Sequence, residues 1–384
     1  MTSKIAHLKS GMMRVLCTYI KGLEKGLRDI DSLILFVTKD NRMSFEKYSS
    51  KKIKLKNTDN SKLIQELRFV DVIHFAFNEI ELEQNLIPTV VTICDLIPEH
   101  FPDLFPESIR KKRRYDCQNA DFIITISEYV RDDVIARYGI DSKKIRCAYP
   151  SIEEIYKKKF KSSELSRVKK KYHLPEKFLL YPATARPHKN HETLFKVFNN
   201  IRTDISLVLT TGETHRPERL ENLRMTSNKY TNSRIKILGH IEENDFPVFY
   251  SLAHAVVIPS LSEGFGYPAI EAMALSCPVV CSNVTSLPEI AGNGALYFDP
   301  NDPNDMLKKI EMVMNNSKLR ENLIKLGKKN IKRFDEIISA SVLLSAYREV
   351  SGQSFSKEFF KRLRNWSKRS MVKQRDHYDQ SSSK

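Results

Sequence analysis

The segment of residues 256–299 constrains the fold of this chain more than any other part of the sequence. An apolar run at 254–259 predicts one buried strand, and a second run at 278–281 predicts another. Between them, residues 269–275 are good helix formers, and Pro268 stands where the first residue of a helix needs no N–H donor. A strand, a helix and a strand in this order predict two parallel strands joined by a right-handed crossover. We therefore expect a parallel sheet covered by helices.

The rest of the chain repeats this alternation of apolar runs and helical patterns, which predicts the α/β class with doubly wound parallel sheets. The predicted strands outside that segment are residues 4–8, 32–38, 51–56, 70–76, 88–94, 122–126, 145–149, 178–182, 206–210 and 235–238. A length of 384 residues suits two domains, which we place at 1–165 and 172–335. The lysine-rich stretch from residue 151 to about residue 174 predicts a linker between them.

The charge balance limits the class of partner. The chain has 63 Lys and Arg against 47 Asp and Glu, a net charge of +16 that attracts anionic partners. No motif of a DNA- or RNA-binding domain is visible and the basic residues are spread along the chain, so we expect no nucleic-acid partner. The basic tail at 351–384 mixes apolar and basic residues as an interfacial helix does, with a solvated tail as the open alternative.

Other features of the sequence favour a cytoplasmic protein without a metal. No run reaches the ~18 apolar residues that span a bilayer, and the start lacks the apolar region of a signal peptide. The six cysteines show no zinc or disulfide spacing, which fits a reducing cytosol, and no His, Asp and Cys pattern predicts a metal site.

Only Ser10 and Gly11 remain of a turn before the first predicted helix, which indicates a truncated N-terminus or a degenerate first strand.

The loop after the strand at 254–259 carries the chemistry of the segment. Glu263 lies at the carboxyl end of that strand, and Gly264 and Gly266 allow a ligand to approach the backbone. The following helix offers free N–H groups, which bind anions, at the carboxyl edge of a sheet. Glu263 and Glu271 do not suit a bare phosphate, but carboxylates accept hydrogen bonds from hydroxyl groups. The loop therefore predicts a ligand with phosphates and hydroxyls, such as a nucleotide sugar.

Glu263 and Glu271, separated by seven residues, with GFGYPAIEAMA between and after them and SLPEIAGNGALYFDP downstream, resemble the signature of glycosyltransferase family 4. Members of that family are retaining enzymes with the GT-B fold, in which two Rossmann-like doubly wound domains face each other across a cleft. The resemblance implies that the donor binds the C-terminal domain and the acceptor the N-terminal domain. It also implies that a helix at 336–350 returns to the N-terminal domain.

The resemblance assigns roles to individual residues. YPATARPHKN at 181–190 resembles a variant found in lipopolysaccharide mannosyltransferases, which implies that Lys189 binds the donor diphosphate and that Arg186 or His188 assists it. Glu263 and Lys189 are then the catalytic residues, and Glu271 holds the ribose hydroxyls. The remaining expected substrate-binding residues are Gly264, Phe265, Gly266, Tyr267, Ile241 beside the base, and Asp95.

The loop TICDLIP at 92–98 departs from the family pattern. Many relatives have a histidine that contacts the transferred sugar directly before the aspartate, and here that position is Cys94. A thiol is a weaker hydrogen-bonding partner than an imidazole. Asp95 remains, with the expected role of fixing its loop by side-chain to backbone hydrogen bonds. His100 is a further candidate for the missing imidazole.

The resemblance implies a retaining glycosyltransferase that moves a mannose- or glucose-like hexose from a GDP or UDP donor, without a metal or other cofactor. The expected acceptor is a saccharide or lipid-linked molecule in bacterial surface polysaccharide synthesis. The cluster at 110–114 and the basic tail favour a peripheral site on an anionic membrane, at its inner face. A catalytically impaired member that acts as a binding or scaffold subunit is the alternative. A dinucleotide-binding enzyme is disfavoured because the chain has no GxGxxG after an early strand.

Overall fold

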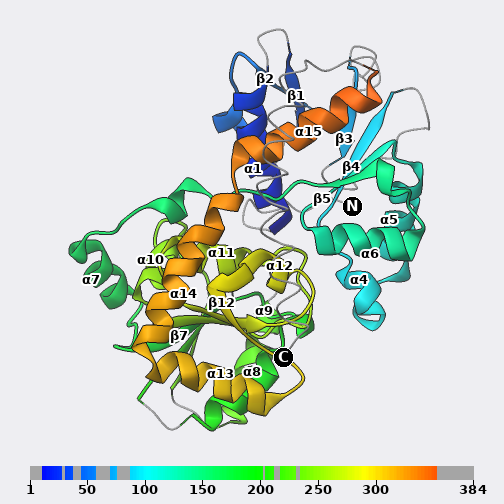
Figure 1. Cartoon of the computed structure of the whole chain (residues 1–384). Helices are drawn as coiled ribbons and strands as arrows, with labels where there is room; N and C mark the ends of the chain where they lie inside the picture. Colours follow the sequence, from blue (N-terminus) through cyan, green and yellow to red (C-terminus); the bar gives the residue numbers. More distant parts are fainter. Residues whose placement is uncertain are drawn as a thin grey trace.

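A computed structural model of the chain describes residues 11–27, 31–37, 45–57, 70–75, 87–201, 204–211, 217–230 and 234–352. These residues form two α/β domains, one above the other in Figure 1, and every paired strand is parallel to its neighbour. The predicted α/β class with parallel sheets is therefore confirmed. The strand predicted at 4–8 and the helix predicted within the tail lie outside the described residues.

The C-terminal domain contains a six-stranded sheet in the order β12-β11-β10-β7-β8-β9. Its strands are β7 (Phe178–Pro182), β8 (Ser206–Thr210), β9 (Ile235–Leu238), β10 (Ala255–Ile258), β11 (Val279–Ser282) and β12 (Ala295–Phe298). The chain moves outward from β7 through β8 to β9 and then returns to the other side of β7 at β10. The strand order thus reverses between β7 and β10, and ligands of open α/β sheets bind outside the carboxyl ends of strands at such a point.

Helices cover both faces of this sheet, and β7, β10 and β11 are accordingly buried at every residue. The helices are α8 (His191–Asn199), α9 (Pro217–Asn228), α10 (Phe246–Leu252), α11 (Tyr267–Ala274), α12 (Leu287–Ala291), α13 (Pro303–Asn315) and α14 (Ser317–Asn330). Side-chain caps define where several of them begin. Asp302 accepts from Asn304 N at the start of α13, and Asn316 accepts from Leu319 N at the start of α14.

The N-terminal domain has a four-stranded parallel sheet in the order β3-β4-β5-β6 and a separate pair of strands, β1 and β2. The strands are β1 (Leu33–Val37), β2 (Ile53–Asn57), β3 (Ile73–Phe75), β4 (Thr89–Ile93), β5 (Phe122–Thr125) and β6 (Ile145–Cys147). The helices are α1 (Gly11–Gly26), α4 (Ile97–His100), α5 (Glu107–Asn119) and α6 (Glu128–Tyr138), with a short 3-10 helix, η3 (Pro102–Leu104). Ser127 caps α6 and Gly139 ends it in the left-handed conformation.

The lysine-rich stretch after β6 folds onto the C-terminal domain, although its sequence predicts only a linker. It contains a 3-10 helix, η5 (Glu154–Lys157), and a helix, α7 (Ser162–Lys171). The buried carboxylate of Asp245, just before α10, accepts hydrogen bonds from Arg167 at 2.5 Å, Lys171 at 2.8 Å and Tyr172 at 3.1 Å. The charges that indicate an exposed linker are therefore used to dock α7.

The last described helix, α15 (Glu336–Val350), leaves the C-terminal domain and packs on α1, β4 and β5 of the N-terminal domain, as Figure 1 shows. Gly22 of α1 permits this approach, because a Cβ at that position would lie 2.3 Å from Glu336 O. The hydroxyl of Tyr347 lies 2.6 Å from His74 Nδ1, and Thr92 Oγ1 lies 2.7 Å from His74 Nε2. The returning helix is thus bonded to His74 of β3, which is bonded in turn to Thr92 of β4.

Candidate functional site

Lys189 and Glu263 meet where the strand order of the C-terminal sheet reverses. Lys189 follows β7 in a short 3-10 helix, η6 (Pro187–Lys189), and Glu263 follows β10. Lys189 Nζ lies 2.6 Å from Glu263 Oε1, and Ser260 Oγ donates to the same oxygen at 2.7 Å. Burial alone would raise the pKa of Glu263, but the ion pair with Lys189 and the bond from Ser260 lower that pKa below its ordinary value. The Glu263 carboxylate is therefore ionised at neutral pH.

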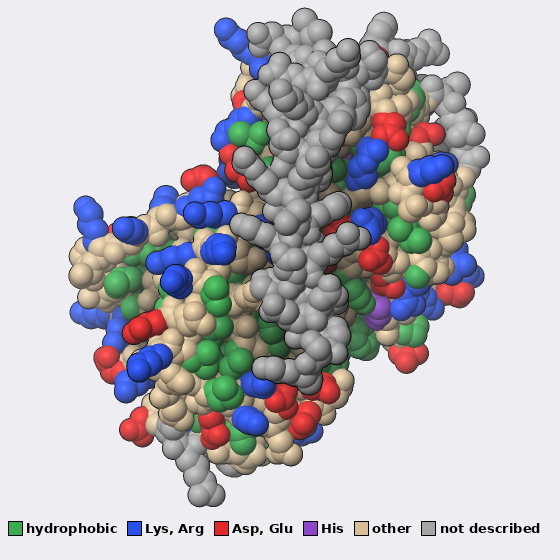
Figure 2. All heavy atoms as spheres, in the orientation of Figure 1, with side chains coloured by type: hydrophobic (Ala, Val, Ile, Leu, Met, Phe, Trp, Pro, Cys, Tyr) green, Lys and Arg blue, Asp and Glu red, His purple; other side chains and the backbone are tan. Residues whose placement is uncertain are grey.

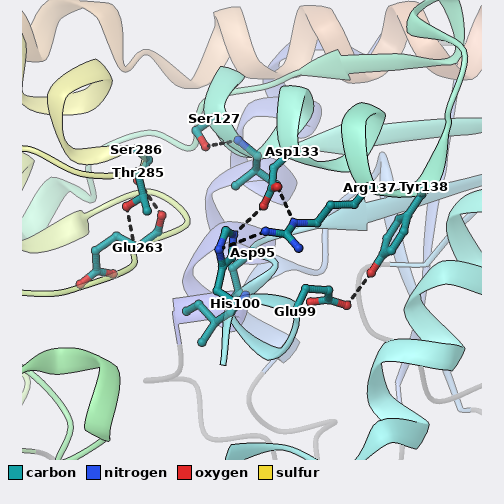
Figure 3. A network of polar contacts seen from close by, with 12 residues as sticks. Asp95, Glu99, His100, Ser127, Asp133, Arg137, Tyr138, Glu263, Thr285 and Ser286 are labelled. Atoms are coloured by element: carbon teal, nitrogen blue, oxygen red, sulfur yellow. Dashed lines mark hydrogen bonds and ion pairs between the residues drawn. The ribbon is translucent and has the colours of Figure 1, made fainter. Parts of the chain in front are cut away.

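The loop that carries Glu263 is held in place by the segment before α12. Thr285 Oγ1 accepts from Glu263 N at 3.0 Å, and Ser286 Oγ donates to Glu263 O at 3.0 Å and to Phe265 O at 3.1 Å (Figure 3). Thr285 adopts φ 54°, a left-handed conformation that is strained for a β-branched residue. Such strain persists where the surroundings fix it and is common at functional sites.

The two glycines of this loop are required for different structural reasons. A Cβ at Gly264 would lie 2.0 Å from Cys94 O in the N-terminal domain, so only glycine allows the two backbones to approach. Gly266 has φ 100° directly before α11, a conformation that side chains disfavour. Phe265 and Tyr267 are buried, and their rings meet edge to face with centroids 5.1 Å apart. The backbone of this loop thus lies at the junction of the domains.

Arg186 and His188 place one exposed cation and one buried imidazole close to Lys189 in the sequence. Arg186 is exposed, whereas His188 is 2% exposed. Burial lowers the pKa of His188 to about 4, and the nearby Lys189 charge adds to this effect, so the ring is neutral at physiological pH. The Nδ1 atom of His188 is buried without a hydrogen-bond partner, and the ring of Phe101 from the other domain lies 6.0 Å away between centroids.

Glu271 is engaged by protein groups. It is 1% exposed; its carboxylate forms an ion pair with Arg14 of α1 and accepts a hydrogen bond from the Tyr250 hydroxyl. Arg14 also donates through Nε to Glu153 at 2.6 Å, and its guanidinium lies 4.2 Å from the centroid of the Tyr267 ring. Burial alone would lower the pKa of Arg14, but Glu271 and the other acidic partners raise it well above its ordinary value.

The other residues expected from the sequence lie in different environments. The side chain of Ile241 is buried in the apolar core, so only its backbone is suited to contact a base. Asp95 Oδ1 accepts from Ile97 N at 3.1 Å, the loop-fixing bond expected of it. Burial raises the pKa of the Cys94 thiol to about 12, which keeps it protonated.

His100 does not provide a free imidazole in place of the missing one. Its Nε2 lies 2.6 Å from Asp133 Oδ2 and its Nδ1 lies 3.4 Å from Arg137 Nη2, as Figure 3 shows. The ring also stacks on Tyr129, with centroids 6.4 Å apart. Both ring nitrogens are therefore committed to neighbours within the N-terminal domain.

Several residues at the domain junction are not indicated by the sequence patterns. Arg14 and Tyr250 engage Glu271, and Ser127 Oγ donates to Gly264 O at 2.7 Å. Glu289 lies within the downstream run SLPEIAG, yet nothing in that run shows that it reaches the other domain. Sequence periodicity reports burial within a domain and carries no signal for such contacts.

No group of three or more His, Cys, Asp or Glu side chains is placed to hold a metal ion among the residues that the structure covers. Within the same ranges, every helix is too short or too polar to cross a lipid bilayer.

Comparison with known proteins shows which proteins the chain is similar to. Residues 162–330 match the family described as Glycosyl transferases group 1. The O-antigen chain mannosyltransferase RfbU of Salmonella typhimurium is 29% identical over 214 residues, a match covering 55% of this chain and 57% of RfbU. The O-antigen chain mannosyltransferase B of Escherichia coli is 28% identical over 276 residues, which covers 70% of this chain and 72% of that relative. The match therefore spans little more than half of RfbU.

Solved structures with the same fold support the arrangement of the two domains. A glycosyltransferase from Rickettsia africae superimposes with a TM-score of 0.70 at 16% identity, covering 91% of this chain and 97% of that one. Anabaena HepE in complex with UDP and glucose superimposes with a TM-score of 0.69 at 15% identity, covering 88% of this chain and 96% of that one. The predicted arrangement of two Rossmann-like domains is confirmed.

Proposed function

We propose that this chain transfers a hexose from a nucleotide diphosphate sugar to a hydroxyl group, with retention of the anomeric configuration. The match of residues 162–330 to the family of group 1 glycosyl transferases and the GT-B fold support this proposal. The observation that carries this proposal is the 2.6 Å pair of Lys189 and Glu263 at the carboxyl ends of β7 and β10. That position is where open α/β sheets bind nucleotides. A charged lysine there can counter the diphosphate, and a fixed carboxylate can accept from sugar hydroxyls.

Cationic groups and backbone N–H groups would hold the diphosphate. Lys189 supplies a compact charge and Arg186 an exposed guanidinium beside it. The N-terminus of α11, which follows the loop of Glu263, adds N–H donors and the positive end of a helix dipole. Charge that develops on the leaving diphosphate is then stabilised without reorganisation of the site, which is the largest catalytic effect in many enzymes.

The ribose hydroxyls would bind Glu271, once Arg14 has moved away from its carboxylate. Tyr250 comes from the same domain as Glu271, whereas Arg14 comes from the other domain. Withdrawal of the Arg14 side chain alone would therefore expose the carboxylate to the ribose, while Tyr250 stays and orients it.

The acceptor hydroxyl would lose its proton to the leaving phosphate. The acceptor oxygen attacks the anomeric carbon, the bond from that carbon to the diphosphate oxygen breaks, and the departing oxygen takes the acceptor proton on the same face. Two observations support this front-face route. The Cys94 thiol is protonated because its pKa is raised to about 12, and both ring nitrogens of His100 are engaged by Asp133 and Arg137. Neither group is suited to act as a base.

The relatives favour mannose or a similar hexose as the transferred sugar. Both RfbU and mannosyltransferase B are named as O-antigen chain mannosyltransferases. HepE is described in complex with UDP and glucose. A GDP or UDP hexose as donor, and a saccharide or lipid-linked acceptor in surface polysaccharide synthesis, fit these names.

A surface of α5 and η3 would bring the enzyme to an anionic membrane at the inner face of the cell envelope. The apolar side chains of Leu104, Ile109 and Tyr115 are 44%, 40% and 50% exposed. Lys111 and Arg114 are exposed on the same helix. On the face drawn in Figure 2, lysine and arginine side chains are spread over both domains and mixed with acidic ones. Sedimentation with anionic and neutral liposomes tests this surface, and equal binding to both would contradict it.

A catalytically impaired member that acts as a binding subunit is the second candidate, and Cys94 at the usual histidine position favours it. Incubation with a panel of nucleotide sugars and measurement of released nucleotide diphosphate separates the two. If the chain is an enzyme, turnover should be strongly reduced in Lys189→Ala and Glu263→Gln, and NMR should show that the product retains the anomeric configuration. Nucleotide binding without turnover would support the binding subunit, and no nucleotide binding at all would contradict the proposed donor site.

A further inference from the structure

The N-terminus of α6 in the N-terminal domain is capped by a carboxylate from the C-terminal domain. Glu289 of α12 accepts from Glu128 N at 2.7 Å through one oxygen and from Tyr129 N at 2.8 Å through the other. The next N–H group, that of Val130, is satisfied by Ser127 Oγ at 3.2 Å. The first three N–H groups of this helix therefore have partners, and two of those partners are supplied by the other domain.

The same helix start is bonded to the loop that carries Glu263. Ser127 Oγ donates to Gly264 O at 2.7 Å, and Figure 3 places Ser127 on a segment that neighbours the one with Glu263, Thr285 and Ser286. Both contacts come from the first residues of α6, and both cross from one domain to the other. A motion that separates the domains must break them together.

Glu289 and the 263–267 loop are also connected within the C-terminal domain. Ser286 precedes α12 and donates to Glu263 O and Phe265 O, while Thr285 accepts from Glu263 N. The 263–267 loop, the start of α12 and the start of α6 therefore form a closed ring of hydrogen bonds. Two sides of this ring exist only when the domains are in contact.

We propose that Glu289 is a positioning residue that sets the catalytic loop only in the closed arrangement of the domains. This inference rests on the proposed function for its kinetic consequence. A carboxylate that accepts from two N–H groups at a helix N-terminus forms charge-assisted bonds and neutralises the positive end of the helix dipole. Glu289 thereby stabilises closure and, through Ser286, transmits it to Glu263. Closure of this kind excludes water from the donor.

Kinetics of Glu289→Ala and Glu289→Gln test the positioning role. We expect kcat for transfer to fall by about tenfold in Glu289→Ala, with a smaller change in KM for the donor, since the donor-binding groups remain. The rate of donor hydrolysis by water should rise relative to the rate of transfer. Glu289→Gln keeps one acceptor oxygen, so its kcat and its ratio of hydrolysis to transfer should lie between those of the wild type and those of Glu289→Ala. Kinetics and hydrolysis ratios equal to those of the wild type would overturn the proposal.

Small-angle X-ray scattering of the ligand-free chain tests closure without any substrate. We expect a larger radius of gyration in Glu289→Ala and in Ser127→Ala than in the wild type, and no change in Glu311→Ala on the exposed side of α13. An unchanged radius in both variants overturns the proposal, even if the wild type proves to have no transferase activity. If Glu289→Ala does not fold, the kinetics and the radius of gyration of Glu289→Gln and Ser127→Ala test the proposal instead.

Discussion

Arg14 of α1 and Glu271 of α11 form an ion pair that joins the two domains at a buried position. Arg14 is held further by Glu153 at 2.6 Å and by stacking on Tyr267, and the second oxygen of Glu271 accepts from Tyr250. Removing one partner of a buried pair leaves an uncompensated charge, which costs more than the pair itself contributes.

Arg14→Met should therefore lower the free energy of unfolding by about 3 kcal/mol, because the Glu271 carboxylate is left buried without its cation. The double variant Arg14→Met with Glu271→Gln should lose less than the sum of the two single variants, since no unpaired charge remains. Urea denaturation of the wild type, the two single variants and the double variant measures the coupling free energy between the two side chains. Additive effects would contradict a direct interaction between the two side chains.

The same pair predicts an effect on nucleotide binding. If ribose must replace Arg14 at Glu271, the apparent affinity of the wild type is reduced by the fraction of molecules in which Arg14 has withdrawn. Arg14→Met should then bind GDP or UDP at least about threefold more tightly than the wild type by calorimetry. Arg14→Lys keeps a cation and should stay close to the wild type. Weaker binding in Arg14→Met would show instead that Arg14 assists the donor.

The central part of the fold and of the site follows from local patterns. The apolar runs of β10 and β11 and the helix-forming residues of α11 predict a strand, a helix and a strand, which the structure contains. Lys189 and Glu263 each follow a predicted strand, so both fall at the carboxyl edge of one sheet. The order of the strands, which places β7 beside β10, is what brings these two side chains together.

The contacts between the domains could not be predicted from the same patterns. Arg14 stands in a helix whose other residues predict only an amphipathic helix, and its partner Glu271 is far away in the sequence. Glu289 caps a helix whose own N-cap is Ser127, and no local pattern indicates that a residue of the other domain takes part. The docking of α7 is likewise not indicated by its sequence, since Val168 is the only buried residue of this helix and its lysines are typical of a solvent-exposed segment. Hydrophobic periodicity does not report contacts made by charged side chains.

Lys189 should set the acidic limit of activity through Glu263. The ion pair and the Ser260 bond hold the pKa of Glu263 below its ordinary value of 4.5, so its carboxylate stays ionised below that pH. In Lys189→Met the ammonium group of Lys189 no longer opposes the effect of burial on Glu263, so the pKa of Glu263 should rise. The acidic limb of the residual kcat/KM profile should shift to higher pH relative to the wild type. An unshifted limb would show that Glu263 does not titrate in this range.

The buried His74 predicts how stability depends on pH. Burial lowers its pKa to about 4 from an ordinary value of 6.5, so the unfolded chain binds a proton more strongly than the folded chain between these values. Stability should therefore fall as pH decreases from about 6.5 towards 4, by at most about 1.4 kcal/mol per pH unit for this group. Thermal unfolding measured across this range should show a shallower decline in His74→Gln than in the wild type. Equal slopes would show that His74 does not contribute.

Gly264→Ala tests whether close contact between the domains is needed for catalysis. A Cβ at this position would lie 2.0 Å from Cys94 O and 2.9 Å from Asp95 Cβ, distances that neither backbone can accept without moving. The added methyl group should destabilise the closed arrangement of the domains, since the atoms that it would clash with belong to the other domain. We expect transfer to fall by about a hundredfold, because misplacing a catalytic group by an ångström has an effect of this size. Calorimetry should show that binding of the nucleotide diphosphate to the C-terminal domain changes far less than kcat, and a proportional loss of both would place Gly264 in the donor site itself.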